Sequence, residues 1–279
     1  MRPLAGAVPF MPDFDQISEH YEQDAIVQQS AGDRLLELLR IGSNDDVLDL
    51  GCGPGHLTNR IRERTSGQVT GVDPSPGMIA RARKRYAQSG ITFRTCAGED
   101  LDYTAAFDRI FSNSAFQWFT DPGKALAACF RALRPGGLMA VQAPARDNYC
   151  PNFIRAVEAV RQGRITGRIF AAFTPPWFFL NSAEEYADLF AAAGFSVETA
   201  RIDETCTCHT PAEVYRIFES GAAAGYLDES RYTVPLTQNY LDCFREIVKK
   251  SFTDQVDATG RVRLIFHRLY LVAGKQEGE

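Results

Sequence analysis

A short apolar segment that runs directly into three closely spaced glycines constrains the fold of this chain more than any other feature. The segment spans Val47 to Leu50, and Gly51, Gly53 and Gly55 follow before a helical pattern from His56 to Arg64. The apolar run predicts a buried strand, and the glycines let the backbone pass close to a ligand. Unpaired amides at the start of the helix point toward the same turn. The junction therefore predicts a binding crevice at the carboxyl end of a strand.

An acidic residue, Asp73, ends the next apolar segment 22 residues after Gly51. A carboxylate at this position can accept hydrogen bonds from both hydroxyls of a ribose. A dinucleotide fingerprint needs glycine where this chain has His56, so a pyrophosphate is a poor fit. A tight turn that binds no ligand is the alternative interpretation.

Short apolar segments alternate with longer helical patterns through the first half of the chain, which is typical of a parallel sheet built from βαβ units. The expected strands are Val47–Leu50, Val69–Val72, Ile91–Arg94, Arg109–Ser112, Leu138–Ala143, Ser196–Arg201 and Arg263–Val272. The expected helices include 13–39, 77–88, 122–133 and 183–193. We expect an α/β fold with one large domain.

The alternation of apolar segments and helical patterns stops after the fifth expected strand, and the chain divides there into further parts. We expect a helical cover over 1–40, a ligand-binding core over 41–144, a lid over 145–182, and the end of the sheet over 183–279. The last part carries a helical cap insertion at about 202–260, because sixty residues are too many for a turn.

Composition narrows the class of partner. The chain has 279 residues and a formal net charge of −5, which gives no overall field that would attract nucleic acid or an anionic membrane. The first residues lack the pattern of a signal peptide and no apolar run is long enough for a membrane helix, so we expect a cytoplasmic protein. The seven cysteines are expected to be free thiols, and the Cys206/Cys208/His209 cluster lacks a second ligand pair at zinc-site spacing. We therefore expect no metal site.

The chain resembles the class I S-adenosylmethionine-dependent methyltransferases across nearly its whole length, through the motifs VLDLGCGPG, GVDPSPGM, AGEDL, SNSAFQWF and LRPGG. The resemblance implies a Rossmann-like, doubly wound, mostly parallel seven-stranded sheet with an antiparallel last strand and a helical lid. It implies S-adenosylmethionine as cofactor and S-adenosylhomocysteine as product. Ala97 replaces an Asp that is common in the family, which leaves the 98–99 region for the adenine edge. The cofactor contacts carried over are Tyr21, Asp49, Gly51, Cys52, Gly53, Gly55, Asp73, Pro74, Ser75, Met78, Gly98, Glu99, Asn113 and Ser114.

Two further features resemble the carboxylate-methylating branch of that family, which includes malonyl-acyl carrier protein O-methyltransferase and trans-aconitate methyltransferase. These are the Gln117-Trp118 pair and the Tyr21-x3-Ala25-x2-Gln28 stretch. The resemblance implies that Gln28 and Trp118 donate hydrogen bonds to an acceptor carboxylate. Such an acceptor, with a pKa of about 4, is ionised at neutral pH and needs no general base.

The substrate side is less constrained by the residues. Gln117, Arg164 and Trp177 are the candidate substrate contacts, and Arg161, Arg164 and Arg168 fall on one face if the lid is one helix. His267, Arg268 and Arg146 are further pocket candidates. The acceptor is then a small or carrier-protein-bound carboxylate, and the oligomeric state is not indicated. Two alternatives remain: a base-dependent N-, O- or C-methyltransferase of a specialised metabolite, and a protein that binds the S-adenosyl group without transfer.

Overall fold

The computed structural model of this chain describes residues 26–278, with side chains from residue 31 onward. The predicted role of Tyr21 therefore falls outside the described residues. Gln28 lies in the first turns of helix α3 (Ile26–Leu39), but its side chain also falls outside that description. None of the helices within 26–278 combines the length and apolar character that spanning a bilayer requires.

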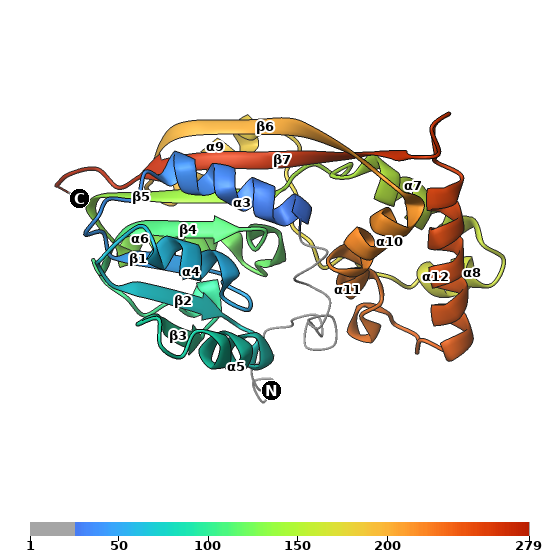
Figure 1. Ribbon diagram of the computed structural model, residues 1–279, viewed down its shortest axis with the longest axis horizontal. Coiled ribbons are helices and arrows are strands. Elements are labelled where there is room, and N and C mark those ends of the chain that lie inside the picture. The colour runs from blue at the N-terminus through green and yellow to red at the C-terminus, as the bar shows by residue number, and fades with distance from the viewer. Residues whose placement is uncertain (1–25, 279) are drawn as a thin grey trace, which may run out of the picture.

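A seven-stranded sheet forms the centre of the molecule (Figure 1), in the order β3-β2-β1-β4-β5-β7-β6. The first five strands are parallel, and β7 runs antiparallel to both β5 and β6. The predicted fold class is therefore confirmed, including the antiparallel last strand. The strands are β1 (Val47–Leu50), β2 (Val69–Asp73), β3 (Thr92–Thr95), β4 (Phe107–Asn113), β5 (Leu133–Pro144), β6 (Ser196–His209) and β7 (Val262–Gly274).

Helices cover both faces of this sheet, so its central strands are buried on both sides. All residues of β1 and β2 are buried, as expected for interior parallel strands. One face packs Leu35 and Leu39 of α3 against Tyr270. The other face packs Phe116 and Phe190 together at 5.7 Å. The covering elements are α4 (His56–Arg62), α5 (Pro76–Arg85), the short helix η1 (Gly98–Asp100), α6 (Pro122–Ala132) and α9 (Ala183–Ala192).

The last two strands are longer than the sequence predicts. Strand β6 continues eight residues beyond Arg201 because it pairs with β7 as far as the His209 and Val262 register. The expected cap insertion from about 202 therefore begins as strand. Its helical part starts with α10 (Pro211–Glu219), whose start is fixed by the Thr210 side chain accepting a bond from Glu213 N.

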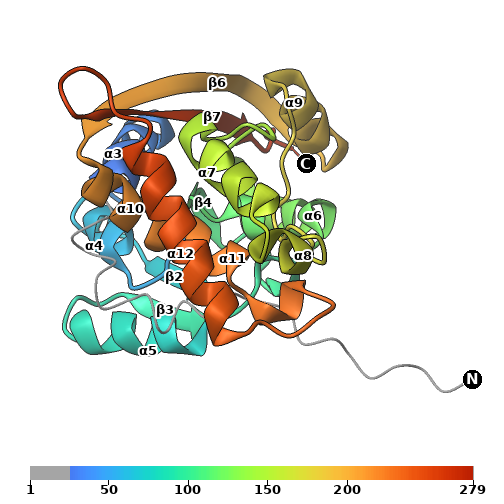
Figure 2. The same cartoon turned by 90° about the vertical axis from the view of Figure 1, so that its right-hand side faces the viewer.

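A helical unit lies beyond one end of the sheet, where β6 and β7 extend toward it (Figures 1 and 2). Segments from before and after β6 build this unit together. Phe153 of α7, for example, contacts Phe218 of α10 at 5.1 Å and Phe252 of α12 at 5.8 Å. The expected lid and the expected cap thus share one apolar core. Its elements are α7 (Pro151–Gln162), α8 (Thr166–Phe170), α10, α11 (Ala222–Tyr226), η3 (Glu229–Arg231) and α12 (Gln238–Thr253).

The single face of arginines that one lid helix would create does not form. Helix α7 ends at Gln162, and α8 begins only at Thr166, whose hydroxyl donates to the carbonyl of Val160 at 2.6 Å. Arg164 therefore lies in the bend between the two helices, where it is exposed. The i, i+3, i+7 spacing has no meaning across such a break.

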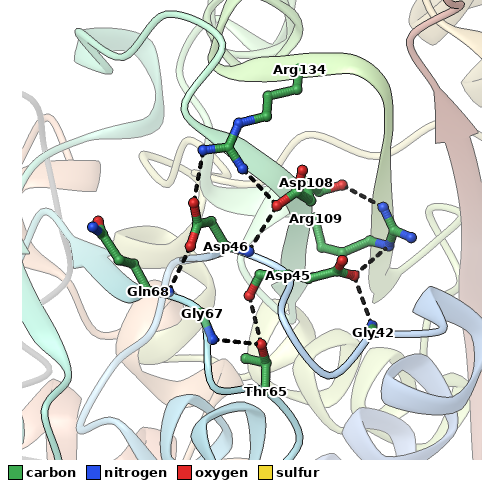
Figure 3. A network of polar contacts seen from close by, with 9 residues as sticks. All are labelled: Gly42, Asp45, Asp46, Thr65, Gly67, Gln68, Asp108, Arg109 and Arg134. Atoms are coloured by element: carbon green, nitrogen blue, oxygen red, sulfur yellow. Dashed lines mark hydrogen bonds and ion pairs between the residues drawn. The ribbon is translucent and has the colours of Figure 1, made fainter.

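At the amino ends of β1 and β4, the half-buried charges are paired (Figure 3). Arg134 bridges Asp46 at 2.7 Å and Asp108 at 2.6 Å. Arg109 pairs with Asp45 at 3.2 Å. A backbone hydrogen bond from Gln68, together with Arg134, lowers the pKa of Asp46. This network lies at the opposite edge of the sheet from the glycine-rich turn, so it stabilises the fold without facing the crevice.

Candidate active site

The glycine-rich turn between β1 and α4 depends on backbone conformations that other residues rarely adopt. Gly51, Gly53 and Gly55 have φ angles of 77°, 52° and 85°. A Cβ atom on Gly51 would lie 2.2 Å from Cβ of Ala115, whereas one on Gly53 would meet nothing within 4 Å. Gly51 is therefore needed for close packing as well as for conformation, and Gly53 for conformation and open access to the cleft.

Asp73 at the end of β2 faces this turn across the start of the cleft. Its Oδ2 accepts a hydrogen bond from Gly53 N at 3.0 Å, and its Oδ1 accepts one from Ser75 N at 2.9 Å. The carboxylate is 7% exposed and lines the cleft. Its position fits the predicted contact with a ribose. Ser75 does not line the cleft; its hydroxyl instead accepts from Met78 N at 3.2 Å and caps α5.

Three residues of the glycine motif lie behind the cleft surface. Asp49 is buried and accepts a hydrogen bond from the Thr58 hydroxyl at 2.6 Å. Burial raises its pKa to about 7. Burial also raises the pKa of the Cys52 thiol, and neither of these residues nor Gly55 lines the cleft. Direct contact of these three residues with a cofactor stays a prediction. In the structure they lie beneath the glycine-rich turn and support it.

The expected adenine side of the cleft is built from three short segments. Pro74 and Met78 line it after β2, and Gly98 and Glu99 line it from η1. Glu99 accepts hydrogen bonds from the backbone of residues 120 and 121 at 2.9 and 3.2 Å. Its carboxylate thus ties η1 to the loop that follows β4. The predicted residues meet at one edge, as their order in the sequence requires.

The loop after β4 contributes several residues to the lining of the cleft. Asn113 and Ser114 line the cleft, and Ser114 adopts a left-handed φ of 56°. Within η2 (Phe116–Trp118), Gln117 is buried and donates from Nε2 to the Ser114 carbonyl at 2.9 Å. Gln117 Oε1 is buried without a hydrogen-bond partner in the described structure. This loop therefore places polar groups and the Trp118 ring in the same cleft.

An aromatic wall, defined here as Trp118, Tyr149, Phe153, Trp177, Phe179 and Phe266, closes the far side of the cleft. The Trp177 ring lies 5.7 Å from Trp118 and 6.3 Å from Phe179. Trp177 packs over Gly225, where a Cβ atom would lie 2.3 Å from the indole ring. Including its mouth and the open solvent there, the cleft has about 1500 Å³ of empty space.

Arg268 on β7 brings a buried cation to this cleft. The side chain is 4% exposed, lines the cleft, and lies 4.7 Å from the centre of the Phe266 ring. The Gln142 amide is oriented so that both of its polar atoms have partners. Its oxygen accepts a hydrogen bond from an Arg268 Nη atom at 3.2 Å, and its nitrogen donates one to Asn113 Oδ1 at 2.8 Å. Within residues 26–278, no carboxylate forms an ion pair with Arg268. Burial lowers the pKa of its guanidinium.

Some of the residues predicted to contact the substrate line the cleft and others do not. Gln117 and Trp177 line the cleft, as does Arg268, whereas Arg164, His267 and Arg146 do not. Sequence reasoning missed Tyr149, Phe153 and Phe266, because alternating or helical apolar residues look the same whether they face a core or a cleft. In the described part of the chain no three His, Cys, Asp or Glu side chains gather as a metal site, and all seven cysteines are free thiols.

A matched pair of glycine substitutions tests this geometry. Gly51→Ala should lower the free energy of unfolding by about 2 kcal/mol more than Gly53→Ala, because both carry the conformational cost but only the first meets Ala115. Urea unfolding measures both. Adding Ala115→Gly to Gly51→Ala should restore most of the difference, and equal losses in the two single variants would contradict the packing role of Gly51.

Comparison with known proteins shows which family the chain resembles. A family model described as a methyltransferase domain matches residues 48–141. Trans-aconitate 2-methyltransferase from Methylobacterium nodulans is 31% identical over 243 residues, which cover 86% of this chain and 90% of that enzyme. Malonyl-acyl-carrier protein O-methyltransferase from Acetivibrio thermocellus is 33% identical over 130 residues. That match covers 46% of the length of the malonyl-acyl-carrier protein O-methyltransferase.

Solved structures share the architecture at lower identity. The YcgJ protein from Bacillus subtilis superimposes with a TM-score of 0.59 at 16% identity, covering 90% of this chain and 100% of that one. Phosphoethanolamine N-methyltransferase 2 from Haemonchus contortus, solved with S-adenosyl-L-methionine, gives 0.59 at 19% identity, covering 98% of this chain and 61% of that one. At these identities the likeness shows the fold alone.

Proposed function

The chain belongs to the S-adenosylmethionine-dependent methyltransferases, in the branch of trans-aconitate 2-methyltransferase and malonyl-acyl-carrier protein O-methyltransferase, and from this premise we propose that it methylates a carboxylate. The products are a methyl ester and S-adenosylhomocysteine. The cofactor fits the chain: the turn at Gly51 and Gly53 and the carboxylate of Asp73 form the crevice that an adenosyl group requires.

The observation that carries the carboxylate proposal is the buried guanidinium of Arg268. A buried charge is costly unless an opposite charge and hydrogen bonds compensate it. No described residue supplies that opposite charge, and the guanidinium lines the cleft beside the loop after β4. An anionic acceptor would supply it. The names of both relatives point to acceptors that carry carboxylates.

The other titratable residues that line the cleft do not form a base site. Asp73 is held by two backbone amides, and Glu99 is held by the loop after η2. Burial raises the pKa of Tyr149 well above its usual value, which makes its phenolate unavailable near neutral pH. No histidine among residues 26–278 lines the cleft. An amine or phenol acceptor must lose a proton, whereas a carboxylate arrives ionised.

Orientation and partial desolvation are then the main tasks of this chain. S-adenosylmethionine supplies an electrophilic methyl group on a sulfonium. A carboxylate oxygen of the acceptor forms the new C–O bond as the C–S bond breaks and its electron pair stays on sulfur. We propose that the Trp118 indole N–H and the Gln28 amide orient the reacting oxygen in line as neutral donors, while Arg268 binds the other oxygen of the same carboxylate.

The test follows the chemistry of the product. The protein is incubated with methyl-labelled cofactor and a panel of carboxylic acids, malonyl thioesters, phenols and amines, and the product is treated with mild alkali. We expect alkali-labile label, strongly reduced in Trp118→Phe and Gln28→Ala, with cofactor affinity retained in both variants. An alkali-stable product would contradict the carboxylate proposal. Absence of transfer to every acceptor would favour a protein that binds the S-adenosyl group without transfer.

A further inference from the structure

The cleft also indicates what kind of carboxylic acid fits it. We propose that the acceptor carries one carboxylate, which binds Arg268, on an apolar and largely flat body that lies against the aromatic wall. This inference rests on the proposed function and names its substrate class. It differs from a polycarboxylic acid and from a malonyl group on a polar carrier arm.

The charged residues that line the cleft indicate that the substrate carries a single anionic group. Among the described residues that line the cleft, Arg268 is the one cation, and Asp73 and Glu99 are the two carboxylates. The two carboxylates are held by backbone amides and face the cofactor side. A second or third substrate carboxylate would therefore be buried without a cation, at a cost of several kcal/mol per ion. Arg164, the other arginine expected to contact substrate, is exposed and lies outside the lining.

The guanidinium is held in place without being neutralised. Its cross-strand neighbour on β6, Asp203, is already in ion pairs with Arg34 at 2.9 Å and Arg201 at 3.3 Å. Gln142 accepts one hydrogen bond from the guanidinium. Among the described residues no other group accepts from it, so the fork retains donors for a carboxylate. The other charged network of the sheet, around Arg134, has a carboxylate at each side of the guanidinium.

The surface next to Arg268 suits an apolar body. Ring contacts connect Phe266 to the rest of the aromatic wall, through Phe153 at 5.5 Å and from Phe153 to Tyr149 at 6.4 Å. Ile217 and Ala222 of the helical unit also line the cleft. Phe266 lies directly under the guanidinium, and Tyr149 stacks on Phe179 at 5.2 Å. Aromatic faces bind flat apolar groups by burial and by ring contact. The wall's polar atoms are the Trp118 and Trp177 indole N–H groups and the Tyr149 hydroxyl, so it carries no charge to pair with a further carboxylate.

Two acids that differ only at one end test the substrate class. Trans-cinnamate and fumarate share a propenoate group, and they carry a phenyl ring and a second carboxylate, respectively. We expect kcat/KM for cinnamate to exceed that for fumarate by at least about 100-fold, because the second carboxylate of fumarate would be buried unpaired. Trans-aconitate and a malonyl thioester serve as further arms. A higher kcat/KM for fumarate, trans-aconitate or the malonyl thioester than for cinnamate would overturn the proposal.

Variants of Arg268 test the anchor. Arg268→Gln should raise KM for cinnamate by at least about 100-fold, and Arg268→Lys should recover part of the loss. Arg134→Gln, which removes a paired arginine on the next strand, serves as the control and should leave KM unchanged. Calorimetry with S-adenosylhomocysteine should give the same affinity for wild type and Arg268→Gln within about twofold. A parallel loss of cofactor affinity would overturn the assignment, because the guanidinium would then bind the cofactor.

Thermal unfolding gives a readout that does not depend on turnover. Because Arg268 is buried without a counter-charge, Arg268→Gln should unfold at a higher temperature than wild type when no acid is present. Cinnamate should raise the unfolding temperature of wild type and leave that of Arg268→Gln unchanged. A destabilised variant, or equal shifts with cinnamate, would contradict the anchor. Failure of the proposed function is distinct, since it gives alkali-stable product or no transfer to any acid.

Discussion

Asp73→Asn is expected to weaken the binding of S-adenosylhomocysteine by about 10²- to 10⁴-fold, because hydrogen bonds to a charged partner are each worth about 1.5–3 kcal/mol. The carboxylate is held by Gly53 N and Ser75 N and lines the cleft where the ribose is expected. An asparagine retains one acceptor oxygen and turns an NH₂ group toward a donor. Both the ribose contact and the tie to the glycine-rich turn are then weakened. Isothermal calorimetry on the purified variant measures the loss.

Asp102→Asn is a suitable control for this change. Asp102 is an exposed carboxylate that pairs with Arg94 at 3.0 Å and does not line the cleft. We expect its affinity for S-adenosylhomocysteine to equal that of wild type. If Asp73→Asn binds as tightly as this control, the position assigned to the ribose is wrong.

Asp49→Asn is expected to remove a large pH dependence of stability. Burial raises the pKa of Asp49 to about 7 in the folded chain, against a reference value of 3.8. A raised pKa means that the folded state holds the proton more tightly than the unfolded state does. The resulting stabilisation is complete below about pH 4 and is lost as the pH rises through about 7.

The expected size of this effect is large enough to measure. Between about pH 5 and about pH 8, the free energy of unfolding of wild type should fall by about 3 kcal/mol relative to Asp49→Asn. The asparagine oxygen can still accept from the Thr58 hydroxyl, so the variant keeps the local hydrogen bond. Denaturant unfolding across this pH range provides the data. A constant difference between the two proteins would show that Asp49 does not titrate there.

Local sequence patterns predicted the strands of the sheet, the glycine-rich turn and Asp73, whereas the other cofactor contacts came from the family resemblance. Strand β1 has its predicted bounds, and the helix expected over 122–133 begins where α6 does, after Asp121 caps it by accepting from Lys124 N. These features depend on near neighbours in the chain, such as a capping side chain or a short apolar run. In the same way, Gly51, Asp73 and Trp118 lie at the carboxyl ends of parallel strands, and the order of the strands alone brings them together.

The acceptor side could not be predicted in the same way, because it is assembled from distant segments. Phe153 and Phe252 belong to stretches separated by β6, and their shared core is visible only after both have folded. The length of β6 depends on its pairing with β7 rather than on its own pattern. Arg268 sits in an apolar strand, and nothing in that pattern distinguishes a buried, unpaired cation from one that reaches solvent. The missed features are therefore those set by tertiary packing.

The central claim is that the acceptor reaches the cleft already ionised and needs no base. The most direct measurement is the pH dependence of kcat with both substrates saturating, in wild type and in Asp49→Asn, where the titration of that buried carboxyl is removed. We expect kcat of Asp49→Asn to be constant between about pH 6 and about pH 9, since a carboxylate is ionised throughout. A tenfold rise in kcat per pH unit over part of this range would reveal a general base and contradict the claim.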